Sequence, residues 1–172
     1  MTGFEDELGK DEFVRLEKEY AEKMGLREVS EEEQKDTSFL YVDEFISFFT
    51  NPPSECAGTP TGYLGSWNYP DIMESFRNKV ARASAALYGF GCRPNGRKPV
   101  WAEMRDKYFN GKPYVDPDEM IGYLDEFDIR EIIAFLHYCT IYKERFFDGI
   151  YGVFTMEGYI GRLLMRLKEL CS

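Results

Sequence analysis

The sequence predicts an all-α fold, a compact single-domain bundle of about six to eight helices. Apolar residues recur at the three- and four-residue spacing of a helix in several separate segments. Helix start signals and Gly or Pro stop signals flank these segments. With 172 residues and 16% aromatic residues, the chain is long enough to bury one core without disulfide or metal support.

An acidic helical extension is predicted at the start of the chain, over residues 1–36. Phe13, Leu16 and Tyr20 fall at helical spacing, while Glu and Lys fill many of the other positions. Because this apolar stripe is narrow, we expect the helix to lie outside the globular domain. The sequence places that domain at residues 37–172.

A buried helix is predicted over residues 38–50, because this segment is apolar on most sides. A strand is the alternative, since Phe, Tyr, Val and Ile also suit sheets. Residues 51–69 contain Gly and Pro at several positions and show no period, which predicts one long loop. Loops of this length are usually functional or mobile.

Two helices are predicted on either side of the Gly- and Pro-rich loop 89–99. The second covers residues 100–109 and ends at the turn Asn110-Gly111. The first begins at Pro70, and its apolar stripe is made of Ile72, Phe76, Val80, Ala83 and Leu87.

The segment from residue 128 to residue 170 has the densest apolar pattern and is expected to form the scaffold. Asp116 followed by Pro117 is a helix start signal, and Asp128 is expected to cap the next helix. That helix is apolar nearly all round, which predicts a central position. The closing helix, from about residue 159, has leucines on one side and charged residues on the other.

The net charge of -10 is divided unevenly along the chain. Residues 1–44 hold 15 acidic and 6 basic side chains, residues 77–112 hold 9 basic and 2 acidic, and residues 113–131 hold 7 acidic and 1 basic. The chain therefore has an acidic head, a basic stretch and an acidic belt.

Cysteine and histidine spacing argues against several kinds of site. The chain has a single histidine, and its four cysteines, Cys56, Cys92, Cys139 and Cys171, form no C-x-x-C pair, so a zinc site is not expected. The phosphate-binding glycine motifs are absent from the sequence. We expect no cofactor and no metal, and we expect reduced cysteines. Cys92 is the best candidate for a reactive thiol, because nearby basic residues favour the thiolate.

The N-terminal residues lack the pattern of a signal peptide, and no apolar run is long enough to span a bilayer. We therefore expect a cytoplasmic protein without a membrane partner. The sequence pattern leaves the oligomeric state open.

The segment KERFFDG supports two interpretations. In the first, Arg145 and Asp148 line a pocket with His137, and the planar guanidinium group binds an anion. In the second, which we favour, Arg145 and Asp148 form an ion pair at a helix corner. Phe146 then fills the core and Gly149 allows close packing. His137 is expected to be a core histidine.

The basic stretch 77–112 is a candidate surface for anions or nucleic acid. Basic side chains would contact phosphates and an indole ring would stack on a base. The candidate residues are Arg77, Arg82, Arg93, Arg97, Lys98 and Trp101. The alternative, which we favour, is that the stretch neutralises the acidic belt or the acidic head, because a negative net charge weakens association with nucleic acid.

The acidic head is the candidate partner-binding segment. Its carboxylates would face a basic protein surface, such as one that normally binds nucleic acid. A solvated helix face without a partner is the alternative. The carboxylates belong to Glu5, Asp6, Glu7, Asp11, Glu12, Glu17 and Glu19.

Near the C-terminus, an Arg-Phe pair, an acid and a Gly precede a second Gly and a Leu-rich helix with basic residues. These residues are Arg145, Phe146, Asp148, Gly149, Gly158, Leu164, Arg166 and Leu167. Over about residues 120–170 the pattern resembles a family of small bacterial and phage- or mobile-element-associated proteins known only as a domain of unknown function. The resemblance implies a helical protein of bacterial or phage origin, and implies no reaction, cofactor or ligand.

Three functions are compatible with these patterns. The sequence favours a non-enzymatic binding protein that engages another protein through charged surfaces, for example as an inhibitor of a nucleic-acid-handling enzyme. The first alternative is a nucleic-acid-binding module built on the basic stretch 77–112. The second is an enzyme with a pocket at Arg145, Asp148 and His137.

Overall fold

Seven α-helices make up most of the part of the chain that the structure describes, which confirms the predicted all-α fold. The structure is a computed structural model, and it describes residues 37–62, 67–86 and 98–172 together with Arg15 and Glu19. The helices are α4 (Asp43–Thr50), α5 (Asp71–Ala86), α6 (Val100–Phe109), α7 (Pro117–Ile121), α8 (Ile129–His137), α9 (Ile150–Met156) and α10 (Tyr159–Leu170). The predicted division at residue 36 stays a prediction.

The predicted starts of α7 and α8 are confirmed by their caps. The Asp116 side chain accepts a hydrogen bond of 3.0 Å from the N–H of Asp118, next to Pro117 in the first turn. At α8, Asp128 and Glu131 form a reciprocal capping box with bonds of 2.8 and 3.0 Å. Each cap satisfies N–H groups that the first helical turn cannot pair, so these local signals fix where the helices begin.

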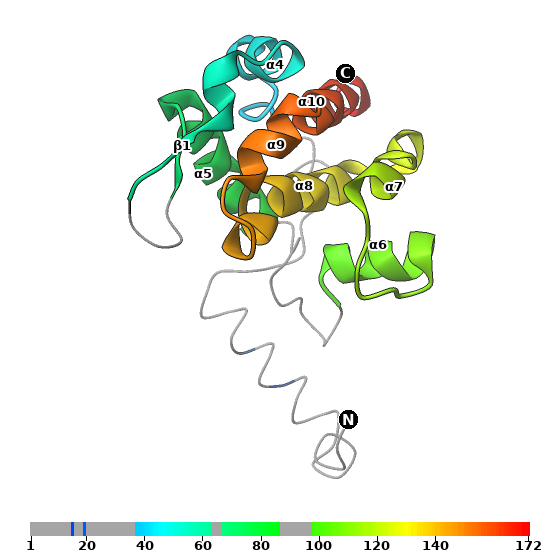
Figure 1. Cartoon of the computed structure of the whole chain (residues 1–172). Helices are drawn as coiled ribbons and strands as arrows, with labels where there is room; N and C mark the ends of the chain where they lie inside the picture. The colour runs from blue at the N-terminus through cyan, green and yellow to red at the C-terminus, as the bar shows by residue number, and fades with distance from the viewer. Residues whose placement is uncertain (1–14, 16–18, 20–36, 63–66, 87–97) are drawn as a thin grey trace.

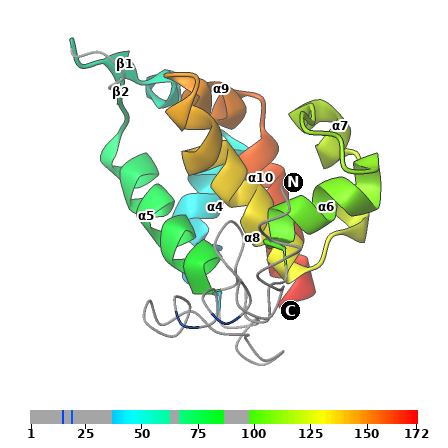
Figure 2. The same cartoon turned by 90° about the horizontal axis from the view of Figure 1, so that it is seen from below.

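Helix α8 is central, as its apolar pattern predicts. It packs against α5, α6 and α10, and in Figures 1 and 2 it lies between α5 and α6. Ile132, Ile133, Phe135 and Leu136 on this helix are completely buried. Because full burial of one such side chain contributes about 1.5–3 kcal/mol, α8 supplies a large share of the core energy.

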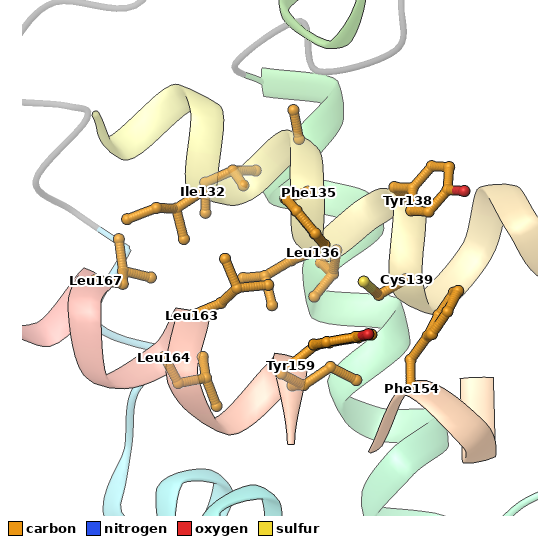
Figure 3. Packing of buried hydrophobic residues seen from close by; sticks show 14 of the residues in the cluster. Ile132, Phe135, Leu136, Tyr138, Cys139, Phe154, Tyr159, Leu163, Leu164 and Leu167 are labelled. Carbon is orange, nitrogen blue, oxygen red and sulfur yellow. The ribbon is translucent and has the colours of Figure 1, made fainter. Parts of the chain in front are cut away.

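The leucine face of α10 covers one side of α8 (Figure 3). Leu163 and Leu167 project toward Leu136 and Ile132, whereas Leu164 lies on the other side of the α10 ribbon, and all five side chains are fully buried. This arrangement confirms the expected orientation of the closing helix. The opposite side of α10 carries the exposed Arg162 and Lys168, as the sequence pattern requires.

Helices α10 and α4 approach each other closely at one glycine. A Cβ atom added to Gly161 would collide with the backbone carbonyl of Phe49. The contact therefore depends on the missing side chain, which lets the two backbones meet. Similarly, a Cβ atom at Gly152 of α9 would lie 2.7 Å from the carbonyl oxygen of Cys56.

The predicted loop 51–69 is only partly irregular. A 3-10 helix, η1 (Ser54–Ala57), is followed by two short strands, β1 (Thr59–Pro60) and β2 (Trp67–Asn68), which pair antiparallel. The Trp67 indole donates a 3.0 Å hydrogen bond to the carbonyl of Ala57, and its ring packs where Gly58 and Gly149 carry no side chain. Contacts with residues distant in the sequence, such as Gly149, thus support regular structure in a segment for which the Gly and Pro pattern predicts only a loop.

The helix that starts at Ile129 changes its winding near its end. Beyond α8 the chain forms a π turn, η4 (Tyr138–Tyr142), and then a 3-10 turn, η5 (Lys143–Arg145). The Thr140 hydroxyl donates to the carbonyl of Leu136 at 2.9 Å, a side-chain bond that competes with the regular helix ladder. The sequence pattern predicts an uninterrupted helix here, so this change of winding is a finding of the structure.

None of the described helices has both the length and the apolar content needed to cross a membrane.

Candidate functional site

A cleft lined by aromatic side chains lies between α6 and the turns η4 and η5. Its volume is about 600 Å³. Six rings line it, and we call it the aromatic cleft: Trp101, Tyr114, Tyr138, Tyr142, Phe146 and Phe147. This volume is in the range of clefts that bind ligands or short chain segments.

The rings of the cleft form a continuous series. Trp101 of α6 stacks on Tyr138, with ring centroids 4.5 Å apart and 17° between the planes. Tyr138 is followed by Tyr142 at 6.0 Å, and Tyr142 by Phe146 at 5.6 Å. The last three residues are spaced by four along the chain, so the winding of η4 and η5 places their rings in a row.

The cleft has a buried floor and an exposed rim. Trp101 and Tyr138 are only 7% and 6% exposed, because each covers a face of the other. Tyr114, Phe146 and Phe147 are 86%, 65% and 55% exposed. Three large rings on one rim are unusual on a protein surface that contacts only water.

The charged groups that line the cleft are both positive. Arg105 donates to the carbonyl of Pro113 at 3.3 Å, and the Lys143 ammonium lies 4.6 Å from the centre of the Phe147 ring. The remaining lining residues, Pro99, Ala102 and Val115, are uncharged, and within the part of the chain that the structure describes no carboxylate lines the cleft. These positions keep both cations beside the aromatic surface.

Burial raises the pKa of Tyr138 to about 12, with smaller contributions from Cys139 and Tyr142. Its hydroxyl therefore keeps its proton at neutral pH and is able to donate a hydrogen bond. In Figure 3 the Tyr138 ring points away from Leu136 and Leu163, with its oxygen outermost.

A second, shallower cleft of about 430 Å³ brings together two residues that the sequence analysis assigns to different sites. Arg77 and Arg145 line it with Asn78 and Glu144. Arg77 is engaged by Glu74, 2.6 Å away, and its guanidinium group lies 5.5 Å from the centre of the Tyr69 ring. Arg145 is exposed. Because each arginine has a carboxylate on the same cleft or beside it, this surface has little net charge.

The candidate pocket at Arg145, Asp148 and His137 is not assembled in that cleft, which neither Asp148 nor His137 lines. Among the described residues, no ion pair joins Arg145 to Asp148. The expectation of a corner ion pair is therefore wrong. Burial, with a smaller contribution from Arg145, lowers the pKa of His137 to about 4, so the imidazole is neutral at physiological pH.

Two further expectations concern the same corner. Phe146 does not fill the core, because its side chain is 65% exposed at the rim of the aromatic cleft. Gly149 does allow close packing: it adopts a φ of 85°, and a Cβ atom there would lie 3.1 Å from the Trp67 ring.

The described part of the basic stretch is largely engaged within the molecule. Lys98 pairs with Asp106 at 2.6 Å, and Lys107 lies 3.6 Å from Glu131 of the acidic belt. Trp101 is buried against Tyr138, so its faces are not open for stacking on a base. Arg82 is exposed. These contacts fit the interpretation as internal charge balance, while Arg93 and Arg97 lie outside the described residues.

The acidic head lies outside the described residues except at two positions. Arg15 and Glu19 are helical and form an ion pair of 2.9 Å, with both side chains more than half exposed. The candidates outside are Glu5, Asp6, Glu7, Asp11, Glu12 and Glu17.

The described cysteines, Cys56, Cys139 and Cys171, are free thiols. Burial raises the pKa of Cys56 and, more strongly, that of Cys139, so both favour the unreactive thiol form. Cys92, the better candidate for a reactive thiol, lies outside the described part of the chain. Within that part, no group of three His, Cys, Asp or Glu side chains is placed to hold a metal ion.

No protein-family model, curated protein or solved structure matches this chain. The aromatic cleft is therefore the strongest functional evidence. Of its rings, only Trp101 was predicted from the sequence to contact a ligand, and Phe146 was expected to fill the core. One sequence feature could have predicted the cleft, namely the pair Phe146-Phe147 within the charged segment KERFFDG. Adjacent bulky apolar residues in charged surroundings often mark an interface.

Proposed function

We propose that the protein is a non-enzymatic binding protein that engages another protein through the aromatic cleft. The observation that carries this proposal is the rim of three exposed rings, Tyr114, Phe146 and Phe147, around a cleft of about 600 Å³. Aromatic residues and Arg are enriched where proteins meet, and a few such residues supply most of the binding energy.

The energetic argument rests on Phe146 and Phe147. Burying a Phe side chain fully contributes about 1.5–3 kcal/mol, so a partner that covers both rings gains a substantial share of the free energy needed for micromolar binding. The buried pair Trp101 and Tyr138 gives the cleft a fixed floor, which reduces the ordering cost of association.

An enzyme built on Arg145, Asp148 and His137 has less support. The cleft lined by Arg145 excludes the other two residues, and the His137 pKa of about 4 is far from the value that suits acid–base catalysis at neutral pH. A nucleic-acid-binding module has less support as well, because Arg77 and Lys98 are engaged by carboxylates and Trp101 is buried.

The proposal extends to a second contact through the acidic head and to a role for a bacterial or phage protein as an inhibitor of a nucleic-acid-handling enzyme. Its supports are the surplus of acidic residues in 1–44 and the resemblance over residues 120–170. Carboxylates presented to a basic surface would steer such a partner into place.

The test is affinity capture with a tagged protein and its Phe146→Ala/Phe147→Ala variant. We expect the proteins enriched by the wild type to be lost or reduced about tenfold with the variant, because the variant removes the exposed apolar rim. The matched control is Val153→Ala/Met156→Ala, which truncates two apolar side chains of α9 that are 49% and 55% exposed. Capture that is equal for all three proteins would overturn the proposal.

A separate variant lacking residues 1–30 tests the contribution of the acidic head. We expect it to lose the captured partner while the thermal unfolding temperature of the body is unchanged. Full retention of the partner by this variant would remove the head from the proposal and leave the cleft in place.

A further inference from the structure

The shape of the aromatic cleft favours an extended chain segment as its occupant. Its rings follow one another from Trp101 through Tyr138 and Tyr142 to Phe146, at centroid distances of 4.5, 6.0 and 5.6 Å. The stacked pair Trp101 and Tyr138 is buried and supports this row, whereas Phe146, Phe147 and Tyr114 are exposed and Tyr142 is half-buried. The accessible rings make a ridged rim, and proline-containing segments in the polyproline II conformation dock on aromatic-lined grooves of this kind. Such segments also lose little conformational entropy on binding.

Hydrogen-bond donors in the cleft suit the same backbone. A polyproline II segment has no internal hydrogen bonds, so its carbonyl groups need outside donors. The Tyr138 hydroxyl lines the cleft and carries its proton at neutral pH. Arg105 also lines the cleft, and its guanidinium group adds further donors. One of its N–H groups donates to the carbonyl of Pro113.

The positive charges that line the cleft favour a negatively charged ligand. Arg105 and Lys143 line the cleft, and none of the acidic side chains that the structure describes does. Lys143 is held beside Phe147 by a cation–π contact of 4.6 Å, so its charge lies at the aromatic surface and not out in bulk water. A negatively charged residue in the ligand meets these two cations at the lining, and the Asp116 carboxylate, which acts on Tyr138, does not itself line the cleft.

We infer that the aromatic cleft binds an acidic, proline-containing segment of a partner protein in an extended conformation. This inference rests on the proposed function and names the chemistry of the partner. Prolines would pack against the exposed rings Tyr114, Phe146 and Phe147, and Asp or Glu beside them would pair with Lys143 and Arg105.

Single-stranded nucleic acid is the other occupant that combines negative charge with flat groups, but the cleft suits it less well. Trp101 and Tyr138 are buried against each other, so only the smaller rings of the rim remain for bases to stack on. Two cations also give a weak contact for a phosphate backbone in a protein with a net charge of -10.

The test measures fluorescence anisotropy with the full chain and labelled synthetic peptides. The probe is a peptide of Glu-Pro-Pro repeats, and its matched partners replace Glu by Lys or Pro by Ala. We expect the Glu-Pro-Pro peptide to bind at least tenfold more tightly than either partner. Equal binding of the Lys-Pro-Pro or Glu-Ala-Ala peptide, or no binding of any of them, would overturn the inference.

Variants locate the binding in the cleft. Lys143→Glu is expected to lower the affinity for the Glu-Pro-Pro peptide about tenfold, whereas Lys143→Arg should keep the affinity of the wild type. Higher salt should reduce the difference in affinity between the two variants, because it screens charge. The matched control is Lys168→Glu on the exposed side of α10, which should leave the affinity unchanged. Equal loss in Lys143→Glu and Lys168→Glu would show a nonspecific charge effect and overturn the assignment.

Two further probes examine other occupants. An oligothymidine that displaces the Glu-Pro-Pro peptide and binds more tightly would assign the cleft to nucleic acid. A synthetic peptide of residues 1–36 that binds more tightly, and loses affinity in Lys143→Glu, would assign it to the protein's own acidic head. Either result overturns the inference.

Failure of the inference and failure of the proposed function give different results. If the Glu-Pro-Pro peptide does not bind but affinity capture still depends on Phe146 and Phe147, only the chemistry assigned to the partner is wrong. If the Phe146→Ala/Phe147→Ala variant also captures the same proteins as the wild type, the proposed function fails as well.

Discussion

The hydroxyl group of Tyr69 donates to the two carboxylate oxygens of Glu144, at distances of 2.8 and 3.0 Å. The two residues are 75 positions apart in the chain. Glu144 also accepts the N–H groups of Gly149 and Tyr151, at 3.2 and 3.0 Å. One carboxylate thus ties the entrance of α5 and the start of α9 to η5, the turn that carries Lys143 at the aromatic cleft.

Replacing Tyr69 by Phe should lower the free energy of unfolding by about 1–3 kcal/mol. The change removes a hydroxyl donor from a partly buried carboxylate and leaves the ring contact with Tyr151 in place. Urea denaturation followed by circular dichroism measures the effect. Tyr114→Phe is the control, because the Tyr114 side chain is 86% exposed and its loss of a hydroxyl should change stability by less than about 0.5 kcal/mol. Equal values for the two variants would contradict the role of Glu144 as an anchor.

Two glycine substitutions separate steric conflict from backbone strain. Gly161→Ala places a Cβ atom against the Phe49 carbonyl where α4 crosses α10, and should cost about 1–3 kcal/mol although Ala favours the helix. Gly158 has a φ of 82°, and a Cβ atom there meets open space. Gly158→Ala should therefore cost about 1 kcal/mol through conformation alone. Thermal unfolding compares the two, and only Gly161→Ala is expected to change chemical shifts in α4.

Acid should destabilise the protein through His137. Its pKa in the folded state is lowered to about 4 from the usual 6.5, so the unfolded chain binds a proton more readily over this interval. Stability is therefore full above about pH 6.5 and falls as the pH drops toward 4, by up to about 3 kcal/mol.

The single histidine makes this prediction easy to check. A titration by nuclear magnetic resonance follows one imidazole signal, which should move with a midpoint near pH 4. In denaturation experiments, His137→Gln should lose part of the pH dependence between 4 and 6.5. A midpoint near 6.5 in the folded protein would show that the imidazole is not buried as described.

Thiol alkylation should report the packing around the cysteines. Cys56 and Cys139 are fully buried and burial raises the pKa of both, so they should react at least tenfold more slowly in the native protein than in urea. Cys171 is partly exposed and should react faster. The sequence adds the prediction that Cys92 reacts fastest. Mass spectrometry after timed exposure to iodoacetamide gives the order, and rapid native labelling of Cys139 would contradict the packing of η4 against α5 and α9.

The sequence predicted those parts of the fold that depend on residues close to one another in the chain. Asp116 and Asp128 cap helices through bonds to residues two and three positions away, so their meaning is readable from the sequence. The apolar residues of α8 likewise report its central position. The pairing of β1 with β2 was not readable, because it depends on Trp67 packing against Gly149, a residue 82 positions away in the chain.

The aromatic cleft was only partly predictable, and Phe146 shows why. In an uninterrupted α-helix, Phe146 would lie two turns after Cys139 on the buried face. The π turn at Tyr138–Tyr142 takes up one additional residue, so the chain beyond it turns a different face to the core. Tyr114 reaches the cleft from another segment altogether, and only the tertiary structure brings it to the rim.

The π turn also makes the geometry of the aromatic cleft sensitive to chain length. Removing one residue between Tyr138 and Tyr142 would allow the α-helix to continue, and each residue of an α-helix corresponds to a rotation of about 100°. Phe146 would then swing toward the interior and the row of rings would be broken, although every aromatic side chain would still be present. A single-codon deletion is therefore expected to dismantle the aromatic cleft, whereas a point substitution removes only one of its side chains. Conversely, a single-codon insertion is enough to turn such a row of rings outward in a helical scaffold.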